Sequence, residues 1–194
     1  MRILLLVNKV PYPPTDGGAY ATLNMALGLS NAGANVSILA MSTPKHSTTA
    51  KDFPKWITSR IDVETVFVDT AINPLRALKN FVFSSIPYNA ERFISLEFEN
   101  ALKVVLKSRK FDVIQLEGLY IEPYIKTIRH YHKGPIAFRA HNVEWELWAR
   151  NASIQTNPLR RLYFRHLSGR IKKMEKDILG EVDALVPISS RDAE

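Results

Sequence analysis

The densest group of polar side chains in the sequence is Arg139-Ala140-His141-Asn142-Val143-Glu144, at the end of a short apolar run. A histidine can donate a hydrogen bond to a sugar hydroxyl or a phosphate oxygen, and an arginine can pair with an anion. We therefore interpret His141 and Arg139 as candidate ligand contacts. The structural alternative is that Asn142 caps a helix over Glu144–Arg150 while His141 bonds to the backbone.

Two glycines, Gly17 and Gly18, follow the apolar run Ile3–Val7 and a loop that prolines stiffen. Where such a loop leads into a helix, glycines let backbone N–H groups approach an anion, and the helix dipole favours negative charge. The pair is therefore a candidate phosphate contact. Its spacing is neither G-x-G-x-x-G nor that of a P-loop, so standard dinucleotide and ATP sites lack support. The alternative is a tight turn without a ligand.

A third polar segment contains Glu117 and Tyr120 and follows the apolar run Asp112–Leu116. A carboxylate at this position can accept hydrogen bonds from sugar hydroxyls or take a proton from an acceptor. The structural alternative is that Glu117 caps the helix that follows.

These three segments lie between β-rich apolar runs and longer helical patterns, which alternate along the chain. Such alternation predicts a parallel sheet with right-handed crossovers, that is, a doubly wound α/β fold. The carboxyl ends of parallel strands share one edge, where ligands bind, so the three segments are expected to converge. Strands are predicted over Arg2–Asn8, Asn35–Met41, Val63–Asp69, Asp112–Leu116, Pro135–Ala140 and Ala184–Ile188. Helices are predicted over Gly18–Asn31, Pro74–Phe83, Leu96–Ser108, Ile121–Tyr131 and Pro158–Leu179, and Ser42–Arg60 is predicted to be a surface connection with one helical turn.

Composition limits the class of protein. The 194 residues, 46% hydrophobic and 23% charged, indicate one globular domain and exclude a disordered or collagen-like chain. The net charge of +7 favours anionic partners. The chain has no cysteine, which excludes disulfides, thiolate zinc sites and thiol nucleophiles. Metal-protease and nucleophile-elbow motifs are missing, as are RNA-binding motifs, so we expect no nucleic-acid partner. A cytoplasmic protein is the simplest fit to a chain without cysteine.

Two basic amphipathic stretches, Pro158–Leu179 and Pro74–Ile86, are candidates for peripheral contact with anionic lipid. The alternative for each is a solvated basic face with an apolar stripe that packs into the core. Exposure of the apolar side chains distinguishes the two interpretations.

Near the end of the chain, Val186–Ile188 is predicted to end the last strand, and Ser189-Ser190-Arg191-Asp192 is predicted to start a helix, with the pattern of a capping box. The sequence stops at Glu194, about one turn into that helix, and a helix so short is marginal alone. We therefore expect the chain to be cut from a longer protein.

The opening Ile3–Pro14, followed by Asp16-Gly17-Gly18, resembles the N-terminal half of family 4 (group 1) glycosyltransferases. These enzymes have the GT-B architecture, in which two Rossmann-like domains face each other across a cleft. Phe111–Glu117, Arg139–Glu144 and Val182–Ser189 match later parts of the family's pattern. The resemblance runs over essentially the whole chain.

This resemblance implies the retaining transfer of a sugar from a nucleotide-sugar donor to a saccharide or lipid-linked acceptor, in the synthesis of a cell-surface polysaccharide or glycolipid. It implies that His141 is the catalytic histidine, in contact with the donor sugar, and that Gly17 and Gly18 contact the donor diphosphate. It implies acceptor-side or supporting roles for Glu117, Tyr120, Arg139, Asn142 and Glu144. No metal or other cofactor is expected, because this family usually stabilises the leaving diphosphate with basic side chains and helix N-termini.

The family's nucleotide-binding C-terminal domain has no counterpart in the 194 residues. Residues 1–194 are therefore expected to form a truncated, acceptor-side domain that is inactive alone. A different class of function stays open, namely a stand-alone α/β module that binds a phosphorylated or nucleotide ligand. A reading frame that continues for a second domain would favour the enzyme.

Overall fold

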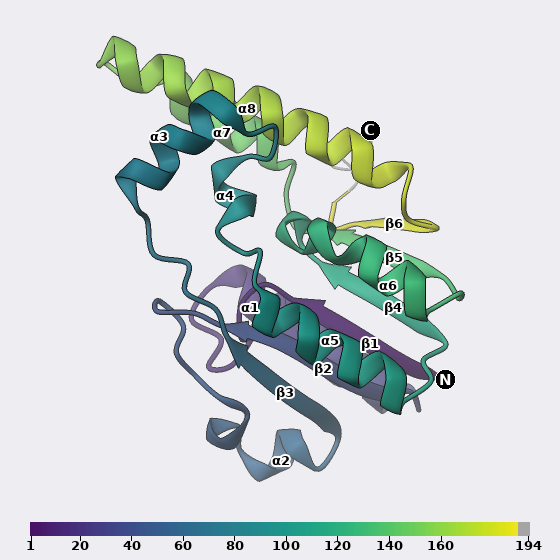
Figure 1. Cartoon of the computed structure of the whole chain (residues 1–194). Helices are drawn as coiled ribbons and strands as arrows, with labels where there is room; N and C mark the ends of the chain where they lie inside the picture. The colour runs from purple at the N-terminus through teal and green to yellow at the C-terminus, as the bar shows by residue number, and fades with distance from the viewer. Residues whose placement is uncertain (190–194) are drawn as a thin grey trace.

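Six parallel strands form one sheet at the centre of the molecule, in the order β3-β2-β1-β4-β5-β6 (Figure 1). The computed structural model describes residues 1–189. The order is that of the classical doubly wound fold and confirms the predicted fold class. The strands are β1 (Arg2–Val7), β2 (Asn35–Ser42), β3 (Ile61–Phe67), β4 (Val113–Glu117), β5 (Ile136–Ala140) and β6 (Ala184–Pro187).

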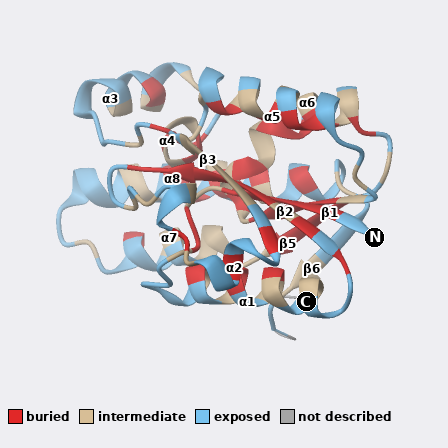
Figure 2. Cartoon of the chain, turned by 90° about the horizontal axis from the view of Figure 1, so that it is seen from below, coloured by how far each residue is buried: buried red, intermediate tan, exposed pale blue. Residues whose placement is uncertain are grey.

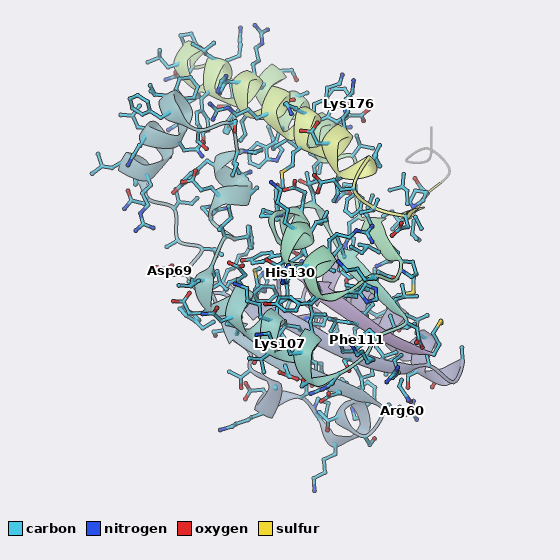
Figure 3. All side chains as sticks on the ribbon, turned by 45° about the vertical axis from the view of Figure 1, so that its right-hand side comes forward. Arg60, Asp69, Lys107, Phe111, His130 and Lys176 are labelled. Carbon is cyan, nitrogen blue, oxygen red and sulfur yellow. The ribbon has the colours of Figure 1, made fainter. Side chains whose placement is uncertain are left out.

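The carboxyl ends of the strands share one edge of the sheet. Figure 3 shows Arg60 and Phe111, which precede β3 and β4, at one edge, and Asp69, which follows β3, at the opposite edge. After β3 the chain crosses back to the other side of β1, so β1 pairs with both β2 and β4. In a doubly wound sheet this change of direction leaves a crevice beyond the carboxyl ends of the two central strands.

The helices confirm most of the predicted ranges. Pro74 and Pro158 each stand in the first turn of a helix, where an N–H group is not needed, and Asn73 and Asn157 cap these helices with their side-chain oxygens. The α-helices are α1 (Gly17–Asn31), α2 (Lys55–Thr58), α3 (Pro74–Phe83), α4 (Tyr88–Glu91), α5 (Leu96–Ser108), α6 (Ile125–Tyr131), α7 (Glu144–Ser153) and α8 (Pro158–Leu179). Two 3₁₀ helices are η1 (Ala50–Asp52) and η2 (Leu119–Tyr124).

Both faces of the sheet are covered because β1 is apolar on both sides. Leu4 and Leu6 belong to a core cluster with side chains of α5, α6 and α8. Ile3 and Leu5 belong to a second cluster with side chains of α1 and α2. Figure 2 shows buried strands between helices whose outer surfaces are exposed.

Three local predictions were wrong. The helix expected over Ile121–Tyr131 is split into η2 and α6, because Pro123 cannot donate the hydrogen bond of a regular α-helix. The short helix α4 was not predicted. The connection at residues 42–60 is not only a surface segment, since Phe53 and Ile57 are buried against the α1 side of the sheet. Residues 190–192 of the helix start expected at 189–192 lie outside the described residues.

Candidate functional site

A pocket of about 550 Å³ lies beyond the carboxyl ends of β1, β4 and β5, at the point where the direction of strand addition changes. The three polar segments singled out in the sequence converge on it. Of the eight candidate residues, seven line this pocket: Gly17, Gly18, Glu117, Tyr120, His141, Asn142 and Glu144. Arg139 does not line it.

His141 is held by Glu117 at the floor of the pocket. The Nε2 atom of His141 lies 2.8 Å from Oε2 of Glu117. Because a carboxylate only accepts, Nε2 carries the hydrogen of this bond. The other ring nitrogen, Nδ1, faces the start of α1, 3.4 Å from the position that a Cβ atom on Gly18 would occupy. The neutral ring therefore presents a hydrogen-bond acceptor to the pocket at Nδ1, and the protonated ring presents a donor.

Glu117 is only 1% exposed, and four side chains donate to its carboxylate. Oε2 accepts from Thr22 Oγ1 at 2.9 Å, from Arg139 Nη1 at 2.8 Å and from His141, and Oε1 accepts from Gln115. Burial raises the pKa of Glu117, but the hydrogen bond from His141 and the charge of Arg139 outweigh it, so the pKa lies below its ordinary value. Glu117 is thus held as an anion.

This geometry changes three interpretations of the sequence. Glu117 does not cap the following helix, because η2 begins after Gly118 without a side-chain cap. Its oxygens are already occupied, so we interpret Glu117 as a residue that positions His141. Arg139 pairs with Glu117 in the interior and does not face the pocket.

The start of α1 carries a charged pair as well as the two glycines. The N-cap residue Asp16 accepts the N–H of Ala19 at 2.9 Å and the ammonium group of Lys9 at 2.6 Å. The hydrogen bond from Lys9 holds the pKa of Asp16 below its usual value. An added Cβ on Gly17 would meet no atom within 4 Å, whereas one on Gly18 would contact Lys9, Asp16 and His141. The two glycines form the first turn of α1.

The opposite wall of the pocket contains Tyr120, Asn142 and Glu144. Tyr120 donates to Oε2 of Glu144 at 3.1 Å, and Asn142 lies on the same wall. Burial raises the pKa of Glu144 and raises that of Tyr120 well above its usual range. A partly buried carboxyl group beside a phenol is a hydrogen-bonding surface suited to hydroxyl groups.

Asn142 does not cap α7, as the structural alternative proposed. The N-cap is Val143, and the carboxylate of Glu175 on α8 accepts the first N–H groups of α7, from Glu144 at 2.7 Å and from Trp145 at 3.0 Å. A half-buried glutamate from another helix therefore caps α7, the helix that begins at Glu144 in the pocket wall.

Sequence analysis did not assign Lys9, Asp16, Thr22 and Glu175. Lys9 and Asp16 stand in the loop that contains the glycines, and Asp16 directly before them is a typical N-cap pattern. Thr22 lies in the second turn of α1 and donates a hydrogen bond to Glu117, which is 95 positions away in the sequence. No local sequence pattern predicts this contact.

Within residues 1–189, no three histidine, aspartate or glutamate side chains are grouped so that they could hold a metal ion. None of the helices in the same range has the length and apolar character needed to cross a bilayer.

The fold resembles those of known glycosyltransferases. Comparison with protein-family models and with curated protein sequences finds no match. Among solved structures, UGT71G1 of Medicago truncatula in complex with UDP-glucose superimposes with a TM-score of 0.51 and 13% identity, over 97% of this chain and 51% of that one. Apo UGT2 of Phytolacca americana gives a TM-score of 0.51 and 11% identity, over 100% of this chain and 47% of that one.

The chain thus spans about half the length of these solved structures. At 13% and 11% identity the likeness shows a shared fold, and it does not distinguish family 4 from other glycosyltransferase families. The chain has a Rossmann-like α/β fold that matches one half of a GT-B glycosyltransferase.

Proposed function

We propose that this chain is the acceptor-side half of a glycosyltransferase, which moves a sugar from a nucleotide-sugar donor to a saccharide or lipid-linked acceptor. The observation that carries the proposal is the Glu117–His141 pair, with Nδ1 of His141 presented to a pocket beside a helix N-terminus. The fold likeness to UDP-glycosyltransferases supports it.

His141 is the proposed contact to the reacting sugar. A ring fixed through Nε2 keeps Nδ1 at one place, where it accepts a hydrogen bond from a hydroxyl group or, when protonated, donates one to a sugar or phosphate oxygen. Glu117 acts through His141: it fixes the ring orientation and stabilises the positive charge that a proton on Nδ1 would add.

The donor diphosphate is proposed to lie against Gly17 and Gly18. The N-terminus of α1 favours an anion, and Gly17 leaves open space above the backbone. Asp16 carries a negative charge at the same place, and Lys9 compensates for it at 2.6 Å. Phosphate bound here would therefore compete with Asp16 for the ammonium group of Lys9.

The opposite wall, formed by Tyr120, Asn142 and Glu144, is the proposed acceptor side. Its groups suit the hydroxyls of a saccharide. The retaining outcome and the group 1 type rest on the sequence motifs alone. We further propose that a second domain supplies most of the nucleotide contacts.

The first experiment measures sugar transfer from UDP-, GDP- and ADP-sugars by the longest polypeptide that the reading frame encodes, as wild type and as His141→Ala. The control is His130→Ala, because His130 is exposed on α6 and does not line the pocket. We expect His141→Ala to lower kcat/KM at least about hundredfold and the control to leave it unchanged. Equal activity of the two variants would contradict the proposed role.

A second experiment titrates the same nucleotide sugars into residues 1–194 and into the longer polypeptide by calorimetry. Binding by the longer polypeptide alone supports a site completed by a second domain. Binding of equal affinity by residues 1–194 would instead favour the stand-alone module for a phosphorylated or nucleotide ligand.

A further inference from the structure

Helix α3 presents an apolar face to solvent. Its outward side chains Leu75, Leu78, Val82 and Phe83 are 79%, 62%, 59% and 81% exposed. Leu75, Leu78 and Val82 follow the i, i+3, i+7 spacing of a single helical stripe. We name these four residues the α3 face. An apolar stripe on a helix normally points into the core, so its exposure needs a physical reason.

The opposite side of α3 attaches the helix to the rest of the molecule. Phe81 packs against His166 of α8, with ring centroids 4.6 Å apart. Arg170 of α8 donates to the backbone and side-chain oxygens of Asn80 at 3.0 and 3.1 Å, and Asn80 is buried. Figure 1 shows α3 beside α8 at one corner of the molecule, away from the sheet. The helix is therefore held in place with its apolar stripe turned outward.

Helix α8, the other basic amphipathic stretch, is arranged in the opposite way. From Leu167 onward its apolar stripe, Leu167, Ile171, Met174 and Ile178, is buried in the core cluster against the sheet. Leu159 and Leu162 in its first turns are exposed, next to the basic side chains there. The exposure of the apolar side chains thus distinguishes the two basic amphipathic stretches: most of the stripe of α8 packs into the core, and that of α3 is exposed along its length.

The surroundings of the α3 face are basic. Arg76 and Lys79 of α3 are exposed, and residues 70–90 contain no aspartate or glutamate. The nearest acidic group is Glu91 of α4, which lines the same pocket as these two side chains but is half-buried and accepts a hydrogen bond from Asn80. The first turns of α8, which precede the residues that contact α3, add exposed Arg160, Arg161 and Arg165, and residues 147–174 also contain no acidic side chain. A partner of this surface must be apolar at its centre and negatively charged around it.

We propose that the α3 face docks on an anionic lipid bilayer. The apolar side chains enter the boundary between headgroups and acyl chains, while Arg76 and Lys79 meet lipid phosphates. An anionic membrane surface offers this combination over a large area, whereas a folded protein would need a matching groove. The proposal rests on α3 and its charges and does not depend on the proposed enzymatic activity.

The first test is co-sedimentation of the chain with vesicles of phosphatidylglycerol and phosphatidylcholine, compared with vesicles of phosphatidylcholine alone. The test variant is Arg76→Glu/Lys79→Glu, and the matched control is Lys51→Glu/Lys55→Glu, at exposed positions near α2. Both variants change the net charge by the same amount. We expect the test variant to lower partition onto the anionic vesicles at least about tenfold, and the control to lower it far less.

Equal losses in the two variants would show that net charge alone attracts the chain to lipid, which would overturn the proposal of a docking face. Absence of binding to anionic vesicles by the wild-type chain at low salt would overturn it as well.

The second test locates the contact. Because the chain has no cysteine, Leu78→Cys gives a single site for an environment-sensitive fluorophore, and Val104→Cys on the exposed side of α5 is the control. With anionic vesicles, we expect a blue shift of the label at residue 78 and none at residue 104. A shift at residue 78 that depends on protein concentration without lipid would assign the face to a second copy of the chain and contradict membrane docking.

Discussion

The Nε2 atom of His141 lies 2.8 Å from the carboxylate of Glu117, and the two residues come from the ends of neighbouring strands, β4 and β5. The side chain of Glu117 is fully enclosed, and that of His141 is partly exposed to the pocket. The pair thus joins the interior of the protein to the proposed site, and most of our predictions concern it.

We expect Glu117→Gln to lower the free energy of unfolding by about 3 kcal/mol, because it leaves the buried charge of Arg139 without its partner. A glutamine nitrogen also cannot accept a hydrogen bond, so one donor around residue 117 would face another donor. Urea unfolding measures the change. The control is Asp62→Asn, which removes an exposed partner of Arg109 and is expected to cost less than about 1 kcal/mol. Similar losses in the two variants would contradict the buried network.

The carboxyl groups of Glu117 and Glu144 should contribute to the free energy of unfolding with opposite dependences on pH. The pKa of Glu117 is lowered below 4.5, so its ionised form stabilises the fold above this value, and the contribution is lost as the pH falls through the folded pKa. Burial raises the pKa of Glu144 above 4.5, so stability falls as the pH rises through its folded pKa.

Unfolding by urea between about pH 3 and about pH 7 checks this prediction. The stability difference between wild type and Glu117→Gln should shrink on acidification below pH 4.5. Relative to wild type, Glu144→Gln should gain stability as the pH rises above 4.5. Parallel curves for wild type and either variant would show that the corresponding pKa is not shifted.

Gly18→Ala should lower the transfer activity without lowering the stability of the fold. An alanine Cβ would sit at ordinary contact distances of 3.4 Å from His141 Nδ1 and 3.5 Å from Lys9 Nζ, so the chain should fold with unchanged or slightly higher stability. The methyl group would, however, cover the nitrogen that faces the pocket. Transfer assays with the longest polypeptide should show a large loss of kcat/KM without a change in thermal midpoint. Full activity of this variant would mean that the ligand does not need to reach Nδ1 of His141 from the side of α1.

Glu175→Ala should destabilise the protein by about 1–2 kcal/mol, because the N–H groups of Glu144 and Trp145 lose their acceptor. Hydrogen exchange should show faster exchange at these two amides than in wild type. Asp177→Ala is a suitable control, since Asp177 is exposed on the same helix and pairs with Lys173 in solvent. Unchanged exchange at both amides would exclude the capping role.

Local sequence patterns predicted those helices and strands that are determined by residues within or next to them. The continuous apolar run Ile3–Val7 predicts a strand covered on both faces, and β1 is the central strand with a core cluster on each side. The range Pro158–Leu179 was predicted to the residue, because Asn157 and Pro158 start the helix and Gly180 follows it. The alternation of strands and helices also predicted the edge at which the polar segments meet.

Contacts that depend on distant residues were not predictable from these patterns. Glu117 was expected to face a ligand, but Thr22 and Arg139 enclose it from α1 and β5. Asn142 looked like a cap because it precedes α7, yet Glu175 reaches the same amides from α8. In each case the hydrogen-bond partner comes from a distant part of the chain, and the spacing of residues in the local sequence does not indicate it.

The four donors on Glu117 have a consequence for the thermodynamics of ligand binding. A histidine at the surface of a pocket normally samples several rotamers and loses this freedom when a ligand arrives. Here the buried carboxylate restricts the imidazole ring of His141 already in the ligand-free protein, so the loss of side-chain entropy takes place during folding. The pocket is preorganised at this residue, and ligand association needs no further ordering of its ring.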